Sequence, residues 1–417
     1  MRKMKDSGIA WIGEIPETWT VTQMRRVLSA VGDGTHASFY SVSNGRPLLS
    51  AKNVFEDGIH IGNDERMISE EDYQSIIASG FPQKNDILLC SVATIGRCCL
   101  YSFDEPQAFQ RSVMFLRTNS LVQPQYLVKW IQSPCFQDEM NAKANISAQA
   151  GVYMGAVKEL SCVLPPMEEQ KKISAYLEKR CNHIRGIIAK VQHMIDKLVV
   201  YKKSLITETV TKGLHPEVAR KDSGVEWIGE IPETWKVTRI SRLFSAKAGG
   251  DAKPEFYADE RDAEHCYPVY TNTNDANQVY AYTSVAPFRG NTITVTGRGA
   301  IGHAIYRNSP YDAIIRLVVL TPKPEFEIDS RFYAYWIDNV VDFFTSSAAI
   351  GQLSASEIAP YKIPVLPYNE QQEIADYLDA KCTAIDADLA KRRALIERLS
   401  DYKRSLIYEV VTGKREV

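Results

Sequence analysis

The sequence predicts an α/β (α+β) protein with two small mixed domains, each followed by one long helix, in a pseudo-two-fold internal repeat. Two observations carry this prediction. A short segment occurs twice in the chain, and a long helical segment occurs twice downstream of it. In addition, 417 residues are more than one hydrophobic core usually needs, so at least two domains are expected.

The short repeat covers residues 5–30 and 221–246, and both copies contain the run WIGEIPETW. Between the repeats the two halves of the chain diverge in sequence. We therefore expect a first domain at 1–165 and a second at 216–365, each with a short repeat near its start.

The helical repeat covers 166–215 and 366–417. Each copy has an opening Pro, acidic residues in the first turn and no later Pro before its end, which predicts a long helix. Apolar residues recur at steps of three and four, the spacing of a coiled-coil seam. The seam positions are Ile173, Leu177, Ile184, Ile188, Val191, Ile195, Leu198 and Leu205 in the first copy, and Ile374, Leu378, Ile385, Leu389, Ile396, Leu399 and Leu406 in the second.

Two long helices with one apolar stripe each most simply bury those stripes against each other. The alternative is two independent amphipathic helices, each packed on its neighbouring domain. Cys181 and Cys382 lie at equivalent seam positions and are expected to be small core residues. Arg392 interrupts the second seam, either as a register marker or as a side chain that reaches out to solvent.

Inside the domains, NDILLCSVATIGRCCLY (85–101) is similar to GNTITVTGRGAIGHAIY (290–306). Each stretch predicts a strand, a tight turn and a second strand. The turn GRGAIG also satisfies the GxGxxG pattern of dinucleotide-binding proteins. We reject that interpretation because HAIYR continues as a strand, whereas the dinucleotide motif opens a helix.

Composition excludes several classes. The chain has no run of 18 apolar residues, and its N-terminus lacks the apolar stretch of a secretory signal, so a cytoplasmic protein without membrane association is expected. Its eight Cys form no CxxC pair and have no His at zinc spacing, so no metal site is expected. The net charge of −2 counts mildly against a protein that binds nucleic acid unaided.

Together these features resemble the specificity subunit of a type I restriction–modification system. The resemblance rests on the doubled WIGEIPETW, the doubled helix that begins with EQ and ends in YK(K/R)SLI, and the TIG and AIG turns. GDGTHASFY (32–40) and GRPLLSAKNV (45–54) are similar to stretches of such proteins, and YPVYTNTN (267–274) resembles a second type of target domain. The resemblance covers essentially the whole chain, and its specificity lies in the combination.

The resemblance implies two target recognition domains separated by two antiparallel coiled-coil helices. Each domain would read one half of a bipartite site in double-stranded DNA. The helices would act as a spacer and dock two methyltransferase subunits, and restriction/translocase subunits would join through them. The chain itself would be a non-catalytic subunit without a cofactor, and S-adenosylmethionine would be bound by the methyltransferase.

This family role would explain why the repeats are unevenly distributed. A scaffold that docks two identical partners has to repeat, because a pseudo-two-fold axis presents equivalent surfaces to both. The reading domains need not repeat if the two half-sites differ. The divergence between the domains therefore predicts an asymmetric target.

Candidate DNA-reading residues are polar side chains in the turn-rich stretches, since Arg, Lys, Asn and similar groups can bond to base edges in the major groove. They are His36, Lys52, Thr94 and Arg97 in the first domain, and Asn272, Asn274, Arg298 and His303 in the second. A lone polar residue of this kind on a turn is more often simply solvated, and the Asn residues also suit a role as turn formers.

The sequence lacks the Asn-Pro-Pro-aromatic and FxGxG motifs of an amino-methyltransferase and the nucleophile motifs of hydrolases, so an independent enzyme is not expected. Two alternatives stay open. The chain could be a coiled-coil assembly protein whose globular domains bind proteins, or a specificity subunit that serves a fused methyltransferase–nuclease.

Overall fold

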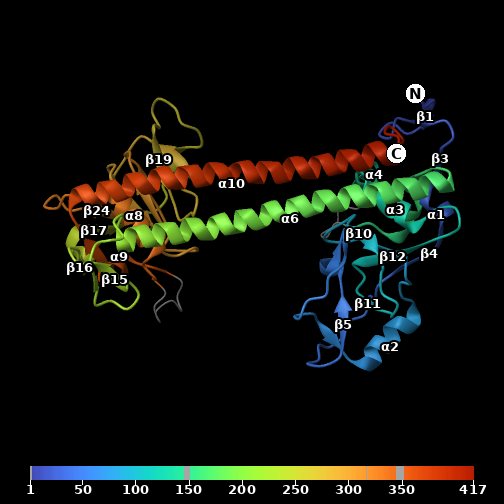
Figure 1. Cartoon of the computed structure of the whole chain (residues 1–417), viewed down its shortest axis with the longest axis horizontal. Coiled ribbons are helices and arrows are strands. Elements are labelled where there is room, and N and C mark those ends of the chain that lie inside the picture. Colours follow the sequence, from blue (N-terminus) through green and yellow to red (C-terminus); the bar gives the residue numbers. More distant parts are fainter. Residues whose placement is uncertain (1, 145–150, 316, 344–351) are drawn as a thin grey trace. The chain divides into compact units, whose positions relative to one another are not determined.

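The computed structural model describes most of the chain, namely residues 2–144, 151–315, 317–343 and 352–417. The chain divides into two compact units (Figure 1). Unit 1 comprises Met1–Val191 and Ala394–Val417, and unit 2 comprises Gln192–Arg393. Each unit therefore contains one domain together with a part of both long helices.

The N-terminal domain is built on a four-stranded antiparallel sheet with the order β10-β9-β12-β4. Its strands are β4 (Leu28–Asp33), β9 (Ile87–Cys90), β10 (Cys98–Leu100) and β12 (Val113–Thr118). The Ile-Leu-Leu-Cys run of β9 is buried at every position, as a short continuous apolar run predicts for an interior strand.

A smaller sheet in this domain has the order β11-β5-β8, in which β5 pairs in parallel with β11 and antiparallel with β8. Its strands are β5 (Arg46–Leu49), β8 (Met67–Ile68) and β11 (Ala108–Phe109). The other elements are α1 (Met24–Val27), η1 (Ala51–Asn53), β6 (Val54–Phe55), β7 (Gly58–Ile59), α2 (Glu70–Ser79), α3 (Pro124–Ile131), α4 (Pro134–Ala142) and α5 (Met154–Glu159).

The C-terminal domain repeats this plan. Its main sheet has the order β22-β21-β24-β17, formed by β17 (Phe244–Ala248), β21 (Thr292–Val295), β22 (Ala304–Arg307) and β24 (Val318–Pro322). The second sheet, β18-β20-β19-β23, contains β18 (Tyr257–Ala258), β19 (Tyr267–Tyr270), β20 (Ala281–Thr283) and β23 (Asp312–Ala313). The remaining elements are α7 (Ile240–Leu243), η2 (Pro254–Phe256), α8 (Ser330–Asn339) and α9 (Ala355–Ile358).

The two domains therefore share a strand order that their sequences barely suggest. In both, the main sheet is antiparallel, and the second sheet contains one parallel pair, β5 with β11 and β19 with β23. The prediction of two mixed α/β domains in an internal repeat is confirmed.

The short repeats form the same local structure twice. The first begins with the hairpin of β1 (Met4–Asp6) and β2 (Glu14–Pro16), and the second with β14 (Arg220–Asp222) and β15 (Glu230–Pro232). The next strand of each repeat pairs antiparallel with the strand before the long helix. These pairs are β3 (Thr20–Gln23) with β13 (Ser161–Leu164), and β16 (Lys236–Arg239) with β25 (Lys362–Val365).

The two long helices are α6 (Met167–Lys212) and α10 (Tyr368–Val411). In unit 1, the beginning of α6 and the end of α10 run side by side in opposite directions, and Ile173 and Leu177 share a core with Leu406 and Val410 (Figure 1). In unit 2, the end of α6 packs in the same way beside the beginning of α10. The two helices are thus antiparallel within each unit.

A buried tryptophan fastens each short repeat to its helix. Trp19 Nε1 donates to Glu169 Oε2 over 2.9 Å, and Trp235 Nε1 donates to Glu370 Oε1 over 3.0 Å. Both indole rings are fully buried. The last Trp of WIGEIPETW and the Glu of the EQ pair are therefore two halves of one repeated contact.

The Gln of the EQ pair has a second repeated role. The buried Gln170 amide accepts from the Gln123 N–H and donates to the carbonyl oxygens of Leu121 and Pro165. Gln371 makes the matching contacts with the Asp329 N–H and the carbonyl oxygens of Glu327 and Leu366. Each Gln satisfies three backbone groups beside the helix start that would otherwise be buried without partners.

The seam positions are buried or half-buried along both helices. Those buried are Ile173, Leu177, Ile184, Val191, Ile195, Ile374, Leu378, Leu389 and Leu406, and those half-buried are Ile188, Leu198, Leu205, Ile385, Ile396 and Leu399. Because the same cores contain domain residues such as Trp19 and Trp235, each helix packs on both its partner helix and a domain. Arg392 lies half-buried in the seam and donates to Asp388 one turn earlier.

Candidate nucleic-acid interface

The two predicted hairpins form at matching places in the two domains, β9–β10 and β21–β22, and both are antiparallel. Their turns share one backbone requirement. Gly96 and Gly302 have φ of +84° and +87°, and a Cβ atom there would lie 1.9 Å from Gln137 Oε1 and 2.6 Å from Phe343 Cδ2. A positive φ favours glycine at both positions, and the Phe343 ring leaves no room for a Cβ at Gly302, which explains the TIG and AIG turns.

In the N-terminal domain, the residue after this glycine is Arg97. Its Nη1 donates to the Val54 carbonyl oxygen over 3.2 Å, and its guanidinium lies 5.1 Å from the ring centre of Phe55. Phe55 in turn stacks on His60, with ring centres 4.5 Å apart. Arg97 therefore supports the segment after β5, residues 50–55, which contains η1 and β6 and which we call the N-terminal loop.

The other N-terminal candidates have varied surroundings. Lys52 lies in the N-terminal loop and pairs with Glu65 over 2.9 Å, while more than half of its side chain stays exposed. Thr94 is half-buried in the hairpin turn that also carries Arg97. His36 is exposed and pairs with Asp33 over 2.7 Å. Lys52 thus belongs to the N-terminal loop, and Thr94 and Arg97 belong to the turn of the β9–β10 hairpin that supports it. His36 lies apart from them in sequence, after β4.

In the C-terminal domain, Asn272 is the second residue of the segment after β19, residues 271–278, which we call the C-terminal loop. Its Oδ1 accepts the N–H groups of Gly297 and Arg298, and its Nδ2 donates to the Ile315 carbonyl oxygen. Both ends of the amide are therefore engaged with backbone. Asn272 positions the hairpin turn, and the exposed Arg298 projects from that turn.

His303 occupies the same position after the turn glycine as Arg97. Its Nδ1 lies 2.5 Å from Asp338 Oδ1 of α8, and its Nε2 lies 3.0 Å from the carbonyl oxygen of Asn274. The hydrogen bond to Asp338 raises the pKa of His303 above its usual value, against the smaller opposing effect of burial. Asn274 thus takes part through its backbone oxygen.

Arg307, at the end of β22, holds the C-terminal loop at a second point. Its Nη1 donates to the Ala276 carbonyl oxygen over 2.8 Å, and its guanidinium stacks 3.6 Å above the ring centre of Tyr270. Arg298 Nη2 donates to Gln352. All four C-terminal candidates are therefore brought together around one loop and one hairpin turn.

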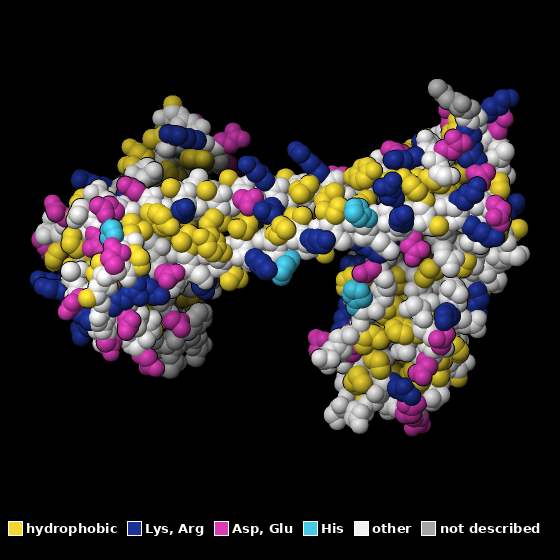
Figure 2. All heavy atoms as spheres, in the orientation of Figure 1, with side chains coloured by type: hydrophobic (Ala, Val, Ile, Leu, Met, Phe, Trp, Pro, Cys, Tyr) yellow, Lys and Arg dark blue, Asp and Glu magenta, His cyan; other side chains and the backbone are white. Residues whose placement is uncertain are grey.

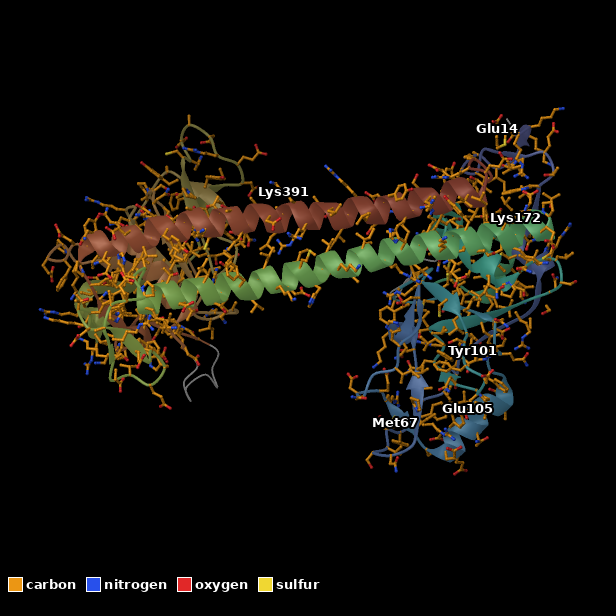
Figure 3. All side chains as sticks on the ribbon, viewed as in Figure 1. Glu14, Met67, Tyr101, Glu105, Lys172 and Lys391 are labelled. Carbon is orange, nitrogen blue, oxygen red and sulfur yellow. The ribbon has the colours of Figure 1, made fainter. Side chains whose placement is uncertain are left out.

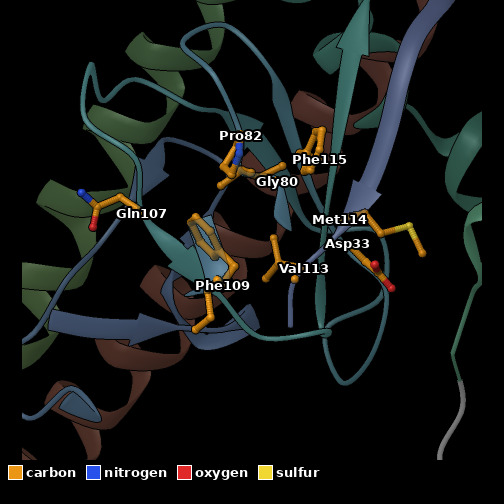
Figure 4. Close-up of a pocket in the computed structure, with 11 residues that line it drawn as sticks. Asp33, Gly80, Pro82, Gln107, Phe109, Val113, Met114 and Phe115 are labelled. Carbon is orange, nitrogen blue, oxygen red and sulfur yellow. The ribbon is translucent and has the colours of Figure 1, made fainter. Parts of the chain in front are cut away.

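The cavities of the two domains differ in size. In the N-terminal domain, a cavity of about 10 Å³ is lined by Phe109, Val113 and Phe115, with Asp33 among its polar residues (Figure 4). This volume holds at most one water molecule. In unit 2, a pocket of about 490 Å³ is lined by both charged partners of the His303–Asp338 pair.

Neither domain presents a surface of a single charge. Lys and Arg side chains alternate with Asp and Glu over the face of each domain that Figure 2 shows. Basic side chains also line the helices, and Lys172 of α6 and Lys391 of α10 are labelled in Figure 3. In the described parts of the chain, no three His, Cys, Asp or Glu side chains are grouped to hold a metal ion.

None of the helices among the described residues has both the length and the apolar character needed to cross a bilayer. The eight cysteines are all free thiols. Burial raises the pKa of the seam thiols Cys181 and Cys382, as expected for small core residues.

Two stretches of this chain, 58–193 and 232–398, match the model of the type I restriction modification DNA specificity domain. The chain belongs to this family. The two matched stretches cover most of the sequence, one in each half of the internal repeat. This protein is therefore a type I specificity subunit with two DNA specificity domains.

Two relatives illustrate the range of similarity. A Methanocaldococcus jannaschii protein named as the MjaX specificity subunit of a type I restriction enzyme is 25% identical over 435 residues, which is 97% of this chain and 96% of the relative. A Mycoplasma pneumoniae protein named as a type I specificity subunit is also 25% identical, over 56% of this chain and 59% of its own length.

One solved structure has a similar fold. It comes from work on complex assembly and conformational transition of the type I R-M system, and it matches with a TM-score of 0.70. The match covers 96% of this chain and 99% of that chain, at 13% identity. At this identity the likeness supports the fold, and the family match supports the assignment.

Several residues of the candidate surfaces carried no signal in the sequence. Asp338, Arg307 and Tyr270 support the C-terminal loop, but each lies in a different element from the loop residues it supports. His60 plays the corresponding part in the N-terminal domain, where it stacks on Phe55 of the N-terminal loop. In the sequence, the only signal for these supports was the similarity of the two hairpins, which aligns Arg97 with His303.

Proposed function

We propose that this specificity subunit reads an asymmetric, bipartite site in double-stranded DNA, with one half-site for each domain. The observation that supports this most directly is the contrast between framework and loops. The two main sheets have the same strand order, whereas the loops they support differ in length, sequence and chemistry. A common framework with different loops suits two readers of different sequences.

Among the candidate residues, those with a polar group directed away from the framework are the proposed base contacts. In the C-terminal domain this is Arg298, which is exposed on a turn held by Asn272. In the N-terminal domain it is Lys52, whose side chain is 55% exposed and whose ammonium would leave its pair with Glu65 to meet DNA. Arg and Lys commonly bond to the O6 and N7 atoms of guanine. His36 and Thr94 are proposed as flanking contacts.

The proposed partners are two methyltransferase subunits docked on the long helices, with restriction subunits joining through them. A repeated surface supports this. Tyr201 and Tyr402 occupy the same position of the helical repeat and are 55% and 50% exposed. Val199 and Val200 extend the exposed apolar surface in unit 2. In this scheme the chain is non-catalytic and cytoplasmic, and S-adenosylmethionine binds to the methyltransferase.

The test is a methylome. This chain is expressed with its genomically adjacent methyltransferase in a host without DNA methylation, and modified bases are identified by single-molecule sequencing. We expect one bipartite, asymmetric motif that disappears when this chain is omitted. A continuous motif, or modification that does not depend on this chain, would contradict the proposal and favour an assembly protein.

A further inference from the structure

His303 is held between two hydrogen-bond acceptors. One is the carboxylate of Asp338, at 2.5 Å from Nδ1, and the other is the backbone carbonyl of Asn274, at 3.0 Å from Nε2. A neutral imidazole carries one N–H and can donate to only one of them. Both hydrogen bonds exist together only when both ring nitrogens are protonated.

We propose that His303 is a positioning residue, whose imidazolium ties the C-terminal loop to α8 and so sets the geometry in which that loop meets DNA. This inference rests on the proposed DNA-reading function and deepens it. It changes the role expected for His303, because both of its ring nitrogens already have protein partners.

The rest of the C-terminal loop is built around this contact. Arg307 donates to the Ala276 carbonyl oxygen, two residues after the carbonyl that His303 holds. Residues 303 and 307 lie on the same face of the extended chain, because side chains of a strand alternate. Asn272 joins the beginning of the loop to the hairpin turn. The backbone from 272 to 276 is thus held by three polar side chains, of which only His303 titrates near neutral pH.

The charges around His303 favour the imidazolium. Asp338 of α8 faces it directly, while Arg307 of β22 opposes its protonation. Arg331 of α8 and Asp379 of α10 line the same pocket, and they pair with each other over 3.0 Å. The pKa of His303 is raised from 6.5. Both hydrogen bonds of the imidazolium, to Asp338 and to the Asn274 carbonyl, are therefore present at acidic pH, and one is lost as pH rises through the raised pKa.

The N-terminal domain provides an internal reference. Arg97 takes the matching position after the turn glycine and donates to the Val54 carbonyl of the N-terminal loop. A guanidinium keeps its charge throughout the accessible pH range. The His303 support of the C-terminal loop should therefore depend on pH, whereas the Arg97 support of the N-terminal loop should not, so the larger pH effect belongs to the half-site of the C-terminal domain.

The experiment uses the full chain in complex with its methyltransferase. Methylation rates are measured on DNA duplexes that carry the identified motif or a single base change in one half-site, from about pH 6 to about pH 9, which spans the titration of histidine. We expect discrimination at one half-site to fall about tenfold as pH rises, the scale of one lost base contact, while discrimination at the other changes much less.

Variants separate positioning from a general structural role. His303→Gln should show low discrimination at that same half-site at every pH. Asp338→Asn should move the midpoint of the transition to lower pH, because the carboxylate that favours the imidazolium is gone. His303→Arg, which imitates Arg97, should restore discrimination at high pH. Intact discrimination at the other half-site serves as the folding control for each variant.

Three outcomes would overturn the inference: a pH effect shared equally by both half-sites, wild-type discrimination in His303→Gln, or an unchanged midpoint in Asp338→Asn. A wild-type complex that modifies no bipartite motif at any pH is a distinct result. It would overturn the proposed function and this inference with it.

Discussion

The two domains use one framework to support two different loops, and their difference lies in the residue that follows the turn glycine. In the N-terminal domain this residue is Arg97, a permanent cation that donates to the Val54 carbonyl. In the C-terminal domain it is His303, whose charge depends on pH and on Asp338. The comparison shows that two copies of a fold can use the same position to support a loop and still place residues of different chemistry there.

The helical repeats show the same effect. Lys202 and Lys403 are matching residues, yet Lys202 pairs with Asp386 of the other helix and Lys403 pairs with Glu56 of the N-terminal domain. By contrast, the contacts of Trp19 and Trp235, and those of Gln170 and Gln371, are the same in both units. The repeat therefore separates shared framework contacts from contacts specific to one unit.

The largest expected effect tests whether the framework contacts are equal. Trp19→Ala and Trp235→Ala each remove a fully buried ring and leave a Glu without its indole donor. Each should lower the free energy of unfolding of its unit by about 3–5 kcal/mol. Urea unfolding, followed by a probe in each unit, measures both losses.

The same run of sequence offers matched controls. Trp11 and Trp227 are 50% and 38% exposed, so their replacement by Ala should cost much less, about 0.5 kcal/mol. A large loss of unfolding free energy on replacing Trp11 or Trp227 would contradict this prediction. So would a loss on replacing only one of the two buried rings, because the two units are expected to respond equally.

The next effect concerns the EQ pair. Gln170→Ala and Gln371→Ala each leave three backbone groups without their side-chain partner. We expect each to destabilise its unit by about 1–3 kcal/mol, measured by thermal and urea unfolding. Gln125→Ala, at an exposed position of α3, is the control and should be close to neutral.

A smaller effect should distinguish the domains by pH. Because the pKa of His303 is raised in the folded state, its contribution to stability is full below its ordinary pKa of 6.5 and is lost as pH rises through the raised value. The side chain is 30% exposed, so the loss should stay under about 1 kcal/mol. Unfolding of unit 2 followed against pH measures it, and His303→Gln should flatten the profile.

The smallest effect tests the contacts specific to one unit. Lys202→Met and Lys403→Met each remove one ion pair that is partly open to solvent. Each should cost about 0.5 kcal/mol, and the cost should decrease in high salt. Double-mutant cycles with Asp386→Asn and Glu56→Gln measure the pair energies. A coupling between Lys202 and Glu56 would contradict the assignment of partners.

The sequence was sufficient for the framework because the framework is repeated and periodic. Recurrence in the sequence makes three features recognisable: the apolar seam, the hairpins around TIG and AIG, and the doubled Trp and EQ pair. The supports of the loops do not recur. Asp338 lies 35 residues from His303, and Glu56 lies 347 residues from Lys403, and no periodicity links such partners.

The candidate DNA-reading residues show the same division. Placement in a turn brought Asn272, Arg298 and His303 to attention, and the three do lie around one turn. Which of them supports the turn and which points outward depends on Ile315 after β23, Asp338 of α8 and Gln352. Residue type alone does not contain that information, so the individual contacts with DNA stay predictions.

The division of α10 between the units bears on how the protein is made. Unit 2 is one uninterrupted stretch, Gln192–Arg393, whereas unit 1 needs Ala394–Val417 to complete its core. On the ribosome, the N-terminal domain therefore emerges first but waits for the end of α10, and unit 2 is the first to have all of its residues. We therefore expect unit 1 to complete its core after unit 2, against the usual order in which the earlier domain finishes folding first. Until α10 is complete, the apolar side of α6 that faces it in unit 1 stays uncovered on the nascent chain.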